Sequence, residues 1–193
     1  CSNDKIIHEI ITNTKGKEII EILSQQDTIV KLKKFKTETG CNVFNLLKVS
    51  KDEKRSDFVY NNLNNILAYA NDDFFIRFIK QYSNEFERNR RNNAKILSSF
   101  FKNINILKYF GFDFVCYLFD STHQGDFIHW LRIVGEYPEI IKNINLKQNE
   151  WKRFLKLFKG YSIFEQIIAH YESLKNKGFI LDDLISIIQR NKK

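Results

Sequence analysis

The chain has 193 residues, of which 43% are hydrophobic and 28% are charged, and its formal net charge is +8. This balance is typical of a globular protein and excludes both a disordered chain and a membrane-resident one. The longest apolar runs, such as residues 110–119, are much shorter than the roughly 20 residues of a membrane-spanning helix, so no transmembrane segment is expected. The length suffices for one core, and we expect a single domain over residues 1–193.

The fold class follows from the few turn residues and from the spacing of the apolar ones. One proline and seven glycines are too few for the many turns of a β-sandwich or barrel. Apolar residues recur at intervals of three and four instead of alternating. The sequence therefore predicts an all-α protein.

The first four residues, Cys1-Ser2-Asn3-Asp4, resemble the mature start of a bacterial lipoprotein, which is lipidated on its first cysteine. The alternative is that the numbering begins inside a longer chain. Two locations therefore stay open. One is the cytoplasm, and the other is a bacterial cell surface with a lipid anchor on Cys1.

Helical periodicity marks several segments in the first half of the chain. Helices are predicted at residues 6–11, at 18–23, from Val43 onward, and over 58–82, where two helices are divided near residues 71–73. Breaks are predicted at residues 15–17, 37–40 and 50–57. Residues 83–93 are expected to be a loop or a frayed helix end.

The second half begins with residues 94–110, a predicted pair of short helices around Lys102-Asn103 that ends at Gly111 as a C-cap residue. Residues 112–118 are expected to be extended or a tightly packed loop, 120–125 a turn, and 135–138 a break. Further short helices are predicted at residues 127–134, 140–144, 151–158, 163–174 and 181–188.

A short pattern recurs at the start of three predicted helices, with glycine first, Ile or Val fourth, and Phe or His fifth. The three copies begin at Gly40, Gly125 and Gly160, and the last two are 35 residues apart. A period of this size is typical of a solenoid of stacked helix pairs, because one pair cannot bury its apolar face alone.

Residues 109–113, 120–131 and 139–142, together with Gly135, resemble the ankyrin repeat, a β-turn followed by two antiparallel helices in about 33 residues. In this comparison residues 120–125 resemble the hairpin tip, and Gly135 the glycine between the helices. Residues 7–9 with 18–20, and 94–96 with 106–110, resemble two further units. The resemblance extends over about half of the chain. It implies about five stacked units over residues 5–190, protein recognition through a concave face, and no cofactor.

The motifs of common enzyme sites are missing from the sequence. The four histidines, His8, His123, His129 and His170, form no helical pair that would place two imidazoles on one metal. Cys1, Cys41 and Cys116 are widely spaced, which favours reduced, structural thiols over disulfides or a zinc site. No phosphate-binding loop and no nucleophile elbow occurs. We therefore expect no catalysis, no metal and no cofactor.

Basic residues gather in clusters that are the candidate partner-binding residues. The first cluster is Lys31, Lys33, Lys34 and Lys36, and the second is Arg88, Arg90, Arg91 and Lys95. A third possible stripe is Lys152, Arg153, Lys156 and Lys159. With a pI near 9.3, the charge favours acidic partners. Many lysines, asparagines and isoleucines are also typical of AT-rich coding sequences, which raise the basic count without any function.

Three classes of function therefore stay open. The first is a protein that binds another protein through a helical-repeat surface, which the ankyrin resemblance favours. The second is a basic protein that binds nucleic acid without sequence preference. The third is a lipoprotein of a bacterial surface, anchored through Cys1.

Overall fold

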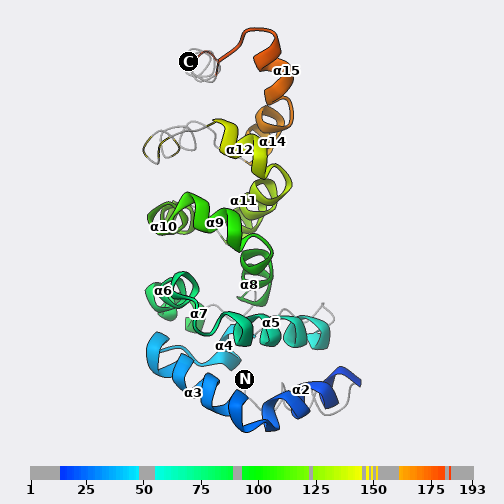
Figure 1. Cartoon of the computed structure of the whole chain (residues 1–193), viewed down its shortest axis with the longest axis vertical. Helices are drawn as coiled ribbons and strands as arrows, with labels where there is room; N and C mark the ends of the chain where they lie inside the picture. The colour runs from blue at the N-terminus through cyan, green and yellow to red at the C-terminus, as the bar shows by residue number, and fades with distance from the viewer. Residues whose placement is uncertain are drawn as a thin grey trace. The chain divides into compact units, whose positions relative to one another are not determined.

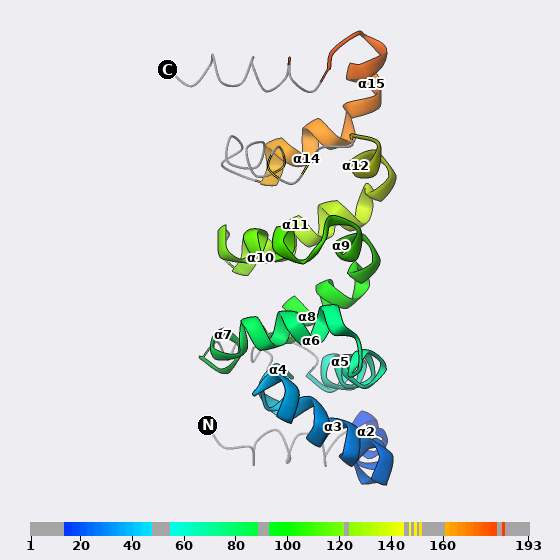
Figure 2. The same ribbon diagram turned by 60° about the vertical axis from the view of Figure 1, so that its left-hand side comes forward.

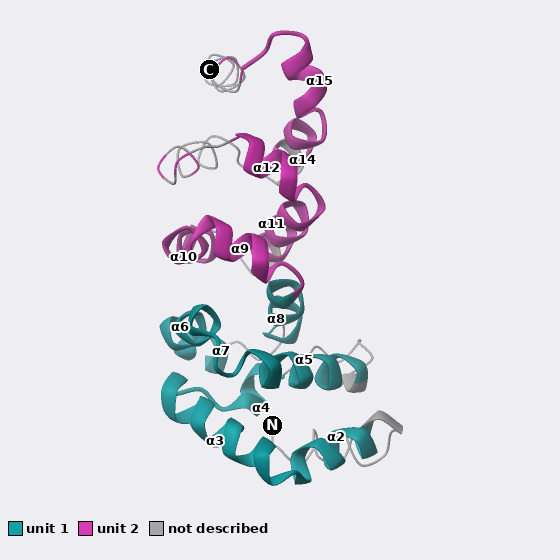
Figure 3. Cartoon of the chain, viewed as in Figure 1, with its two compact units in different colours: residues 1–101 teal, residues 102–193 magenta. Residues whose placement is uncertain are grey.

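The computed structural model describes residues 14–47, 55–88, 93–121, 124–144, 147, 149, 151, 161–180 and 183 (Figure 1). These residues form helices joined by short turns, and no strand occurs among them. The expected all-α class is confirmed. The chain divides into two compact units, unit 1 with residues 1–101 and unit 2 with residues 102–193 (Figure 3). A single domain over residues 1–193 stays a prediction.

The described helices follow one another in sets: a first helix, a second helix close behind it, and in three sets a third helix. The first helices are α2 (Thr14–Ser24), α5 (Arg55–Tyr69), α8 (Asn93–Lys102), α11 (Gln124–Glu136) and α14 (Tyr161–Ala169). The second helices are α3 (Gln26–Thr39), α6 (Asp73–Gln81), α9 (Ile104–Phe110), α12 (Pro138–Ile144) and α15 (Tyr171–Asn176). The third helices are α4 (Val43–Leu46), α7 (Ser83–Arg88) and α10 (Phe112–Ser121).

Directly before each second helix stands one residue whose carbonyl accepts the first backbone hydrogen bond of that helix. This residue is said below to begin the helix. The five bonds measure 2.9 to 3.1 Å, and the accepting residues are Gln25, Asp72, Asn103, Tyr137 and His170. From Asp72 onward these residues are 31, 34 and 33 positions apart. The helix sets therefore recur with a period close to 33 residues.

Equivalent helices of successive sets pack on each other within unit 1. The first helix α2 contacts α5, the second helix α3 contacts α6, and the third helix α4 contacts α7 (Figures 1 and 2). The fully buried rings of Phe35 in α3 and Phe75 in α6 stack with centroids 5.6 Å apart. Phe78 of α6 stacks on Phe100 of α8 at 4.6 Å. Burial of such aromatic rings supplies much of the stabilisation of a core.

Unit 2 repeats this packing between first helices, since α11 contacts α14. Trp130 of α11 and Phe164 of α14 pack edge to face with ring centroids 4.4 Å apart. Trp151 lies 6.1 Å from Phe164 and 5.6 Å from Phe110, so the aromatic rings form a connected core in this unit.

Two buried asparagines tie the sets of unit 1 together. Asn62 of α5 donates from Nδ2 to the carbonyl of Ala94 in α8 over 3.1 Å. Asn93 donates to the carbonyls of Asn45 and Phe86, which belong to α4 and α7. Both side chains are fully buried, and a buried polar group is costly without such bonds. These amides therefore favour one register of the packed helices.

Several predicted boundaries are confirmed. The division near residues 71–73 lies between α5 and α6, and Gly111 is the C-cap of α9 with a left-handed φ of 86°. Asp72 is an N-cap whose side chain accepts from the Phe75 N–H over 3.1 Å. The break at Lys102-Asn103 separates α8 from α9. α4 begins at Val43, shortly after Gly40.

Other local predictions are wrong. Residues 112–118, expected to be extended or a loop, belong to α10, because Phe114, Val115 and Leu118 fall on one buried helical face. The predicted turn at 120–125 overlaps the end of α10 and the start of α11. Residues 15–17 lie inside α2, and α3 continues to Thr39, so only Gly40 of the turn at 37–40 leaves the helix.

The remaining differences concern where helices end. The expected helix at 163–174 is interrupted at His170. Residues 83–88, expected to be part of a loop or a frayed helix end, form the separate helix α7. Within the break expected at 135–138, only Tyr137 is non-helical. The predicted helices at 6–11, 151–158 and 181–188 lie wholly or largely outside the described residues.

Candidate binding surface

The first predicted basic cluster lies on α3, where Lys31, Lys33, Lys34 and Lys36 are all exposed. Lys34 is held by neighbours, since its Nζ lies 3.1 Å from Asn71 Oδ1 and 3.6 Å from Glu38 Oε1. α3 also carries Asp27, so its charge is partly balanced. The cluster is a solvated helix face with a modest excess of positive charge.

The second predicted cluster is divided between elements. Arg88 is exposed at the end of α7, and Lys95 is half-buried in α8. Arg90 and Arg91 lie outside the described residues, as do Lys152, Arg153, Lys156 and Lys159 of the third stripe.

The residues considered for chemistry belong to different elements. Cys41 is fully buried after α3, whereas Cys116 is half-buried on α10. His129 is half-buried on α11 and His170 is exposed, while Cys1, His8 and His123 lie outside the described residues. Within the described ranges, no group of three or more His, Cys, Asp and Glu side chains is placed to hold a metal.

A different set of basic residues follows the repeat. Each second helix carries one basic residue in its last turn, namely Lys36 in α3, Lys80 in α6, Lys108 in α9, Lys142 in α12 and Lys175 in α15. Of these five, only Lys36 belongs to a predicted cluster. The five lysines are called the repeat lysines below.

In unit 2 the repeat lysines have similar neighbours in the sequence as well as the same position in their helices. Each lies five residues after the residue that begins its helix and directly follows an apolar residue, which is buried Leu107 in α9, buried Ile141 in α12 and half-buried Leu174 in α15. Asn or Glu stands three positions before each lysine, and Tyr or Asn one position after it. This five-residue pattern at intervals of 34 and 33 residues is the signal that could have revealed these lysines in the sequence.

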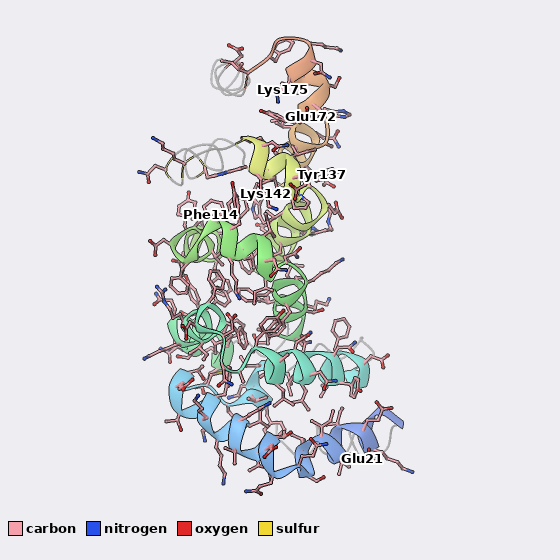
Figure 4. The ribbon with its side chains drawn as sticks, in the orientation of Figure 1. Glu21, Phe114, Tyr137, Lys142, Glu172 and Lys175 are labelled. Carbon is pink, nitrogen blue, oxygen red and sulfur yellow. The ribbon has the colours of Figure 1, made fainter. Side chains whose placement is uncertain are left out.

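One exposed aromatic side chain lies beside Lys142. Tyr109 of α9 is 54% exposed, an unusual exposure for a large aromatic residue. Nζ of Lys142 lies 5.8 Å from the centre of the Tyr109 ring and 2.9 Å from Glu139 Oε1. α9 and α12 are therefore neighbours at this surface. Figure 4 shows Lys142 on α12 and Glu172 and Lys175 on α15.

A second charged group joins first helices of unit 2. The guanidinium of Arg132 in α11 donates to both carboxylate oxygens of Glu136, at 3.0 and 2.9 Å, and of Glu165 in α14, at 3.0 Å each. Hydrogen bonds to Glu136 and then to Glu165 raise the pKa of Arg132 above its ordinary value. Both terminal nitrogens of Arg132 donate to carboxylates, so this group links two helices and is not an open anion site.

The chain matches no protein-family model, no curated protein and no solved structure. Across the ranges given above, no helix combines the length and the apolar character that crossing a bilayer requires.

Proposed function

We propose that the chain is a non-catalytic interaction module that binds a partner protein through the surface of its helical repeats. The observation that carries this proposal is a series of contacts between residues one repeat apart. In unit 1, the ring of Tyr69 stacks on Phe101 and Asn62 bonds to Ala94, each pair 32 residues apart. In unit 2, the pairs are Trp130 with Phe164 and Arg132 with Glu165, 34 and 33 residues apart.

Such contacts are expected of a solenoid in which each repeat touches its neighbours. This supports an ankyrin-like scaffold with degenerate repeats, in which α4, α7 and α10 take the place between helix pairs that ankyrin repeats give to the hairpin. In a solenoid, equivalent residues of successive repeats line one extended surface, and such a surface can bind a segment of another protein. The recurring lysines of the second helices are such positions.

The test is a selection of peptides from a random display library on the folded full-length chain. A protein-binding module is expected to enrich peptides with a shared pattern, each of which binds the purified chain in solution. Random-sequence duplex DNA is titrated in parallel at physiological salt. Nucleic-acid binding falls steeply with salt, with a slope of about −0.9 per neutralised phosphate.

Two outcomes contradict the proposal. One is a selection that enriches no common pattern. The other is sub-micromolar DNA binding that is lost when Arg88, Arg90 and Arg91 are changed to Glu, which would make nucleic acid the partner.

A further inference from the structure

The helix pair α14–α15 is attached to unit 2 mainly through α14. Among the described helices that precede it, α14 has its main contacts with α11. α15 buries no side chain, whereas each of the other second helices buries at least one. Leu174 of α15 is half-buried, although Leu107 and Ile141 at the same position of α9 and α12 are buried. α15 therefore depends on α14 for its place in unit 2.

The junction between α11 and α14 combines an aromatic contact with a charged one. The rings of Trp130 and Phe164, both buried, pack edge to face with centroids 4.4 Å apart. The guanidinium of Arg132 in α11 donates to the Glu165 carboxylate of α14 over 3.0 Å. These two side chains are 42% and 26% exposed, so dissolved salt screens the charged contact. The aromatic contact supplies the larger part of the attachment, and the ion pair adds a smaller, salt-sensitive part.

α11 has further neighbours that do not involve α14. It also packs against α10 and α12. Phe127 of α11 is fully buried and lies 5.0 Å from Phe119 of α10, measured between ring centroids. In a solenoid each repeat touches only its neighbours, so one junction opens without unfolding the others. The contacts of α11 therefore allow α14 and α15 to detach while α11 stays folded.

We propose that α14 and α15 form one hinged element, which detaches from α11 as a unit while α9 to α12 stay folded. The Trp130–Phe164 contact and the Arg132–Glu165 ion pair hold it closed. Opening exposes the buried indole of Trp130 and the buried ring of Phe164, so this apolar surface is accessible only in the open state. This inference concerns a conformational change and does not depend on the proposed function.

Native-state hydrogen exchange of the full-length chain tests the hinged element directly. The amides of α14 and α15 are expected to exchange through one shared opening, which is at least about tenfold more frequent than the opening that exposes α11. Arg132→Ala should raise this opening constant about two- to fivefold and leave exchange in α9 unchanged. Molar sodium chloride should have a similar effect on the unaltered chain and almost none on Arg132→Ala.

Matched variants separate the two ion pairs of Arg132. Glu165→Gln removes the charge on α14 and is expected to raise the opening constant of α14 and α15 about two- to fivefold. Glu136→Gln removes an equal charge within α11 and should leave that constant unchanged. Lys142→Ala, which breaks the exposed pair with Glu139 inside α12, is a second control without expected effect.

Tryptophan fluorescence gives an independent measurement, because the chain has two tryptophans and Trp151→Phe leaves Trp130 alone to report on the junction. In that variant the emission is expected to shift to longer wavelength at a lower urea concentration than that at which the helical circular dichroism is lost. Phe164→Ala, which removes the aromatic partner, should produce the shift without urea. Coincident fluorescence and circular dichroism transitions would contradict local opening.

Three exchange results would overturn the inference. The first is exchange of α14 with the same opening constant and urea dependence as α11, because unit 2 would then open as a whole. The second is equal acceleration by Glu136→Gln and Glu165→Gln. The third is exchange of α15 alone while α14 stays as protected as α11, which would place the hinge at His170.

Discussion

Gly135 in α11 lies directly against the side chain of Asn103, the residue that begins α9. A Cβ on Gly135 would lie 2.8 Å from Asn103 Cγ and would overlap Oδ1 of the same side chain. Asn103 is buried, and the two residues are one repeat apart, so only a glycine allows this approach of neighbouring repeats. The φ of Gly135 does not lie in the positive range that favours glycine. Glycine is needed at this position because any larger side chain would clash with Asn103.

Gly135→Ala is therefore expected to destabilise the protein, by about 1–3 kcal/mol, because the added methyl group overpacks the contact with Asn103. In an open helix the same change would stabilise by about 0.5–1 kcal/mol. Urea unfolding measures the difference. In an Asn103→Ala background, Gly135→Ala should cost much less, so strictly additive effects of the two changes would contradict the contact.

The buried side-chain amides of Asn62 and Asn93 in unit 1 should contribute different amounts to the free energy of unfolding. Asn93→Ala removes hydrogen bonds to two carbonyls, those of Asn45 and Phe86, whereas Asn62→Ala removes one, to Ala94. Each buried carbonyl that loses its donor costs about 1–3 kcal/mol. Chemical denaturation should therefore show the larger loss for Asn93→Ala. A loss equal to or smaller than that of Asn62→Ala would argue against the bridging role of Asn93.

The aromatic core of unit 1 should depend strongly on Phe100, whose ring lies 4.6 Å from Phe78 and 6.0 Å from Phe75. Phe100→Ala is expected to cost about 3–5 kcal/mol of unfolding free energy, because it leaves a cavity among packed rings. Val30→Ala, at a site 55% exposed on α3, is the control and should stay within about 0.5 kcal/mol. Thermal unfolding followed by circular dichroism compares the two.

The charged link between α11 and α14 should be weak and sensitive to salt. Arg132→Ala is expected to cost about 0.5–1 kcal/mol at low ionic strength and less in molar salt, because the side chains are largely exposed. Arg132→Lys should recover only part of the loss, since an ammonium cannot hold two carboxylates as a guanidinium does. An unchanged melting temperature for Arg132→Ala at low salt would refute the link.

The sequence predicts the helical class and many helix boundaries because these depend on local features. Asp72 caps a helix by its own side chain, and Gly111 ends one with a positive φ that glycine adopts readily. α10 was mispredicted because its phenylalanines and Val115 also suit an extended strand, and the choice depends on burial against the rest of unit 2. The break at His170 inside a continuous apolar pattern likewise carries no local sequence signal.

The candidate surface was harder to predict than the fold. Runs of charge in the sequence indicate α3 and residues 88–95. The repeat lysines are single residues, and they correspond to one another only when the second helices are aligned. The five-residue pattern around Lys108, Lys142 and Lys175 was readable in the sequence. That the three lysines occupy the same position in successive helices is seen only from the helix starts at Asn103, Tyr137 and His170.

Backbone amide hydrogen exchange of the full-length chain, alone and with a library-selected peptide, tests most directly that the repeat surface binds a protein segment. Binding to the second helices predicts slower exchange in the last turns of α9, α12 and α15, with little change in α11 and α14. Random-sequence DNA should leave these turns unaffected at physiological salt. Slower exchange confined to the first helices, or produced by the DNA and not by the peptide, would contradict this account.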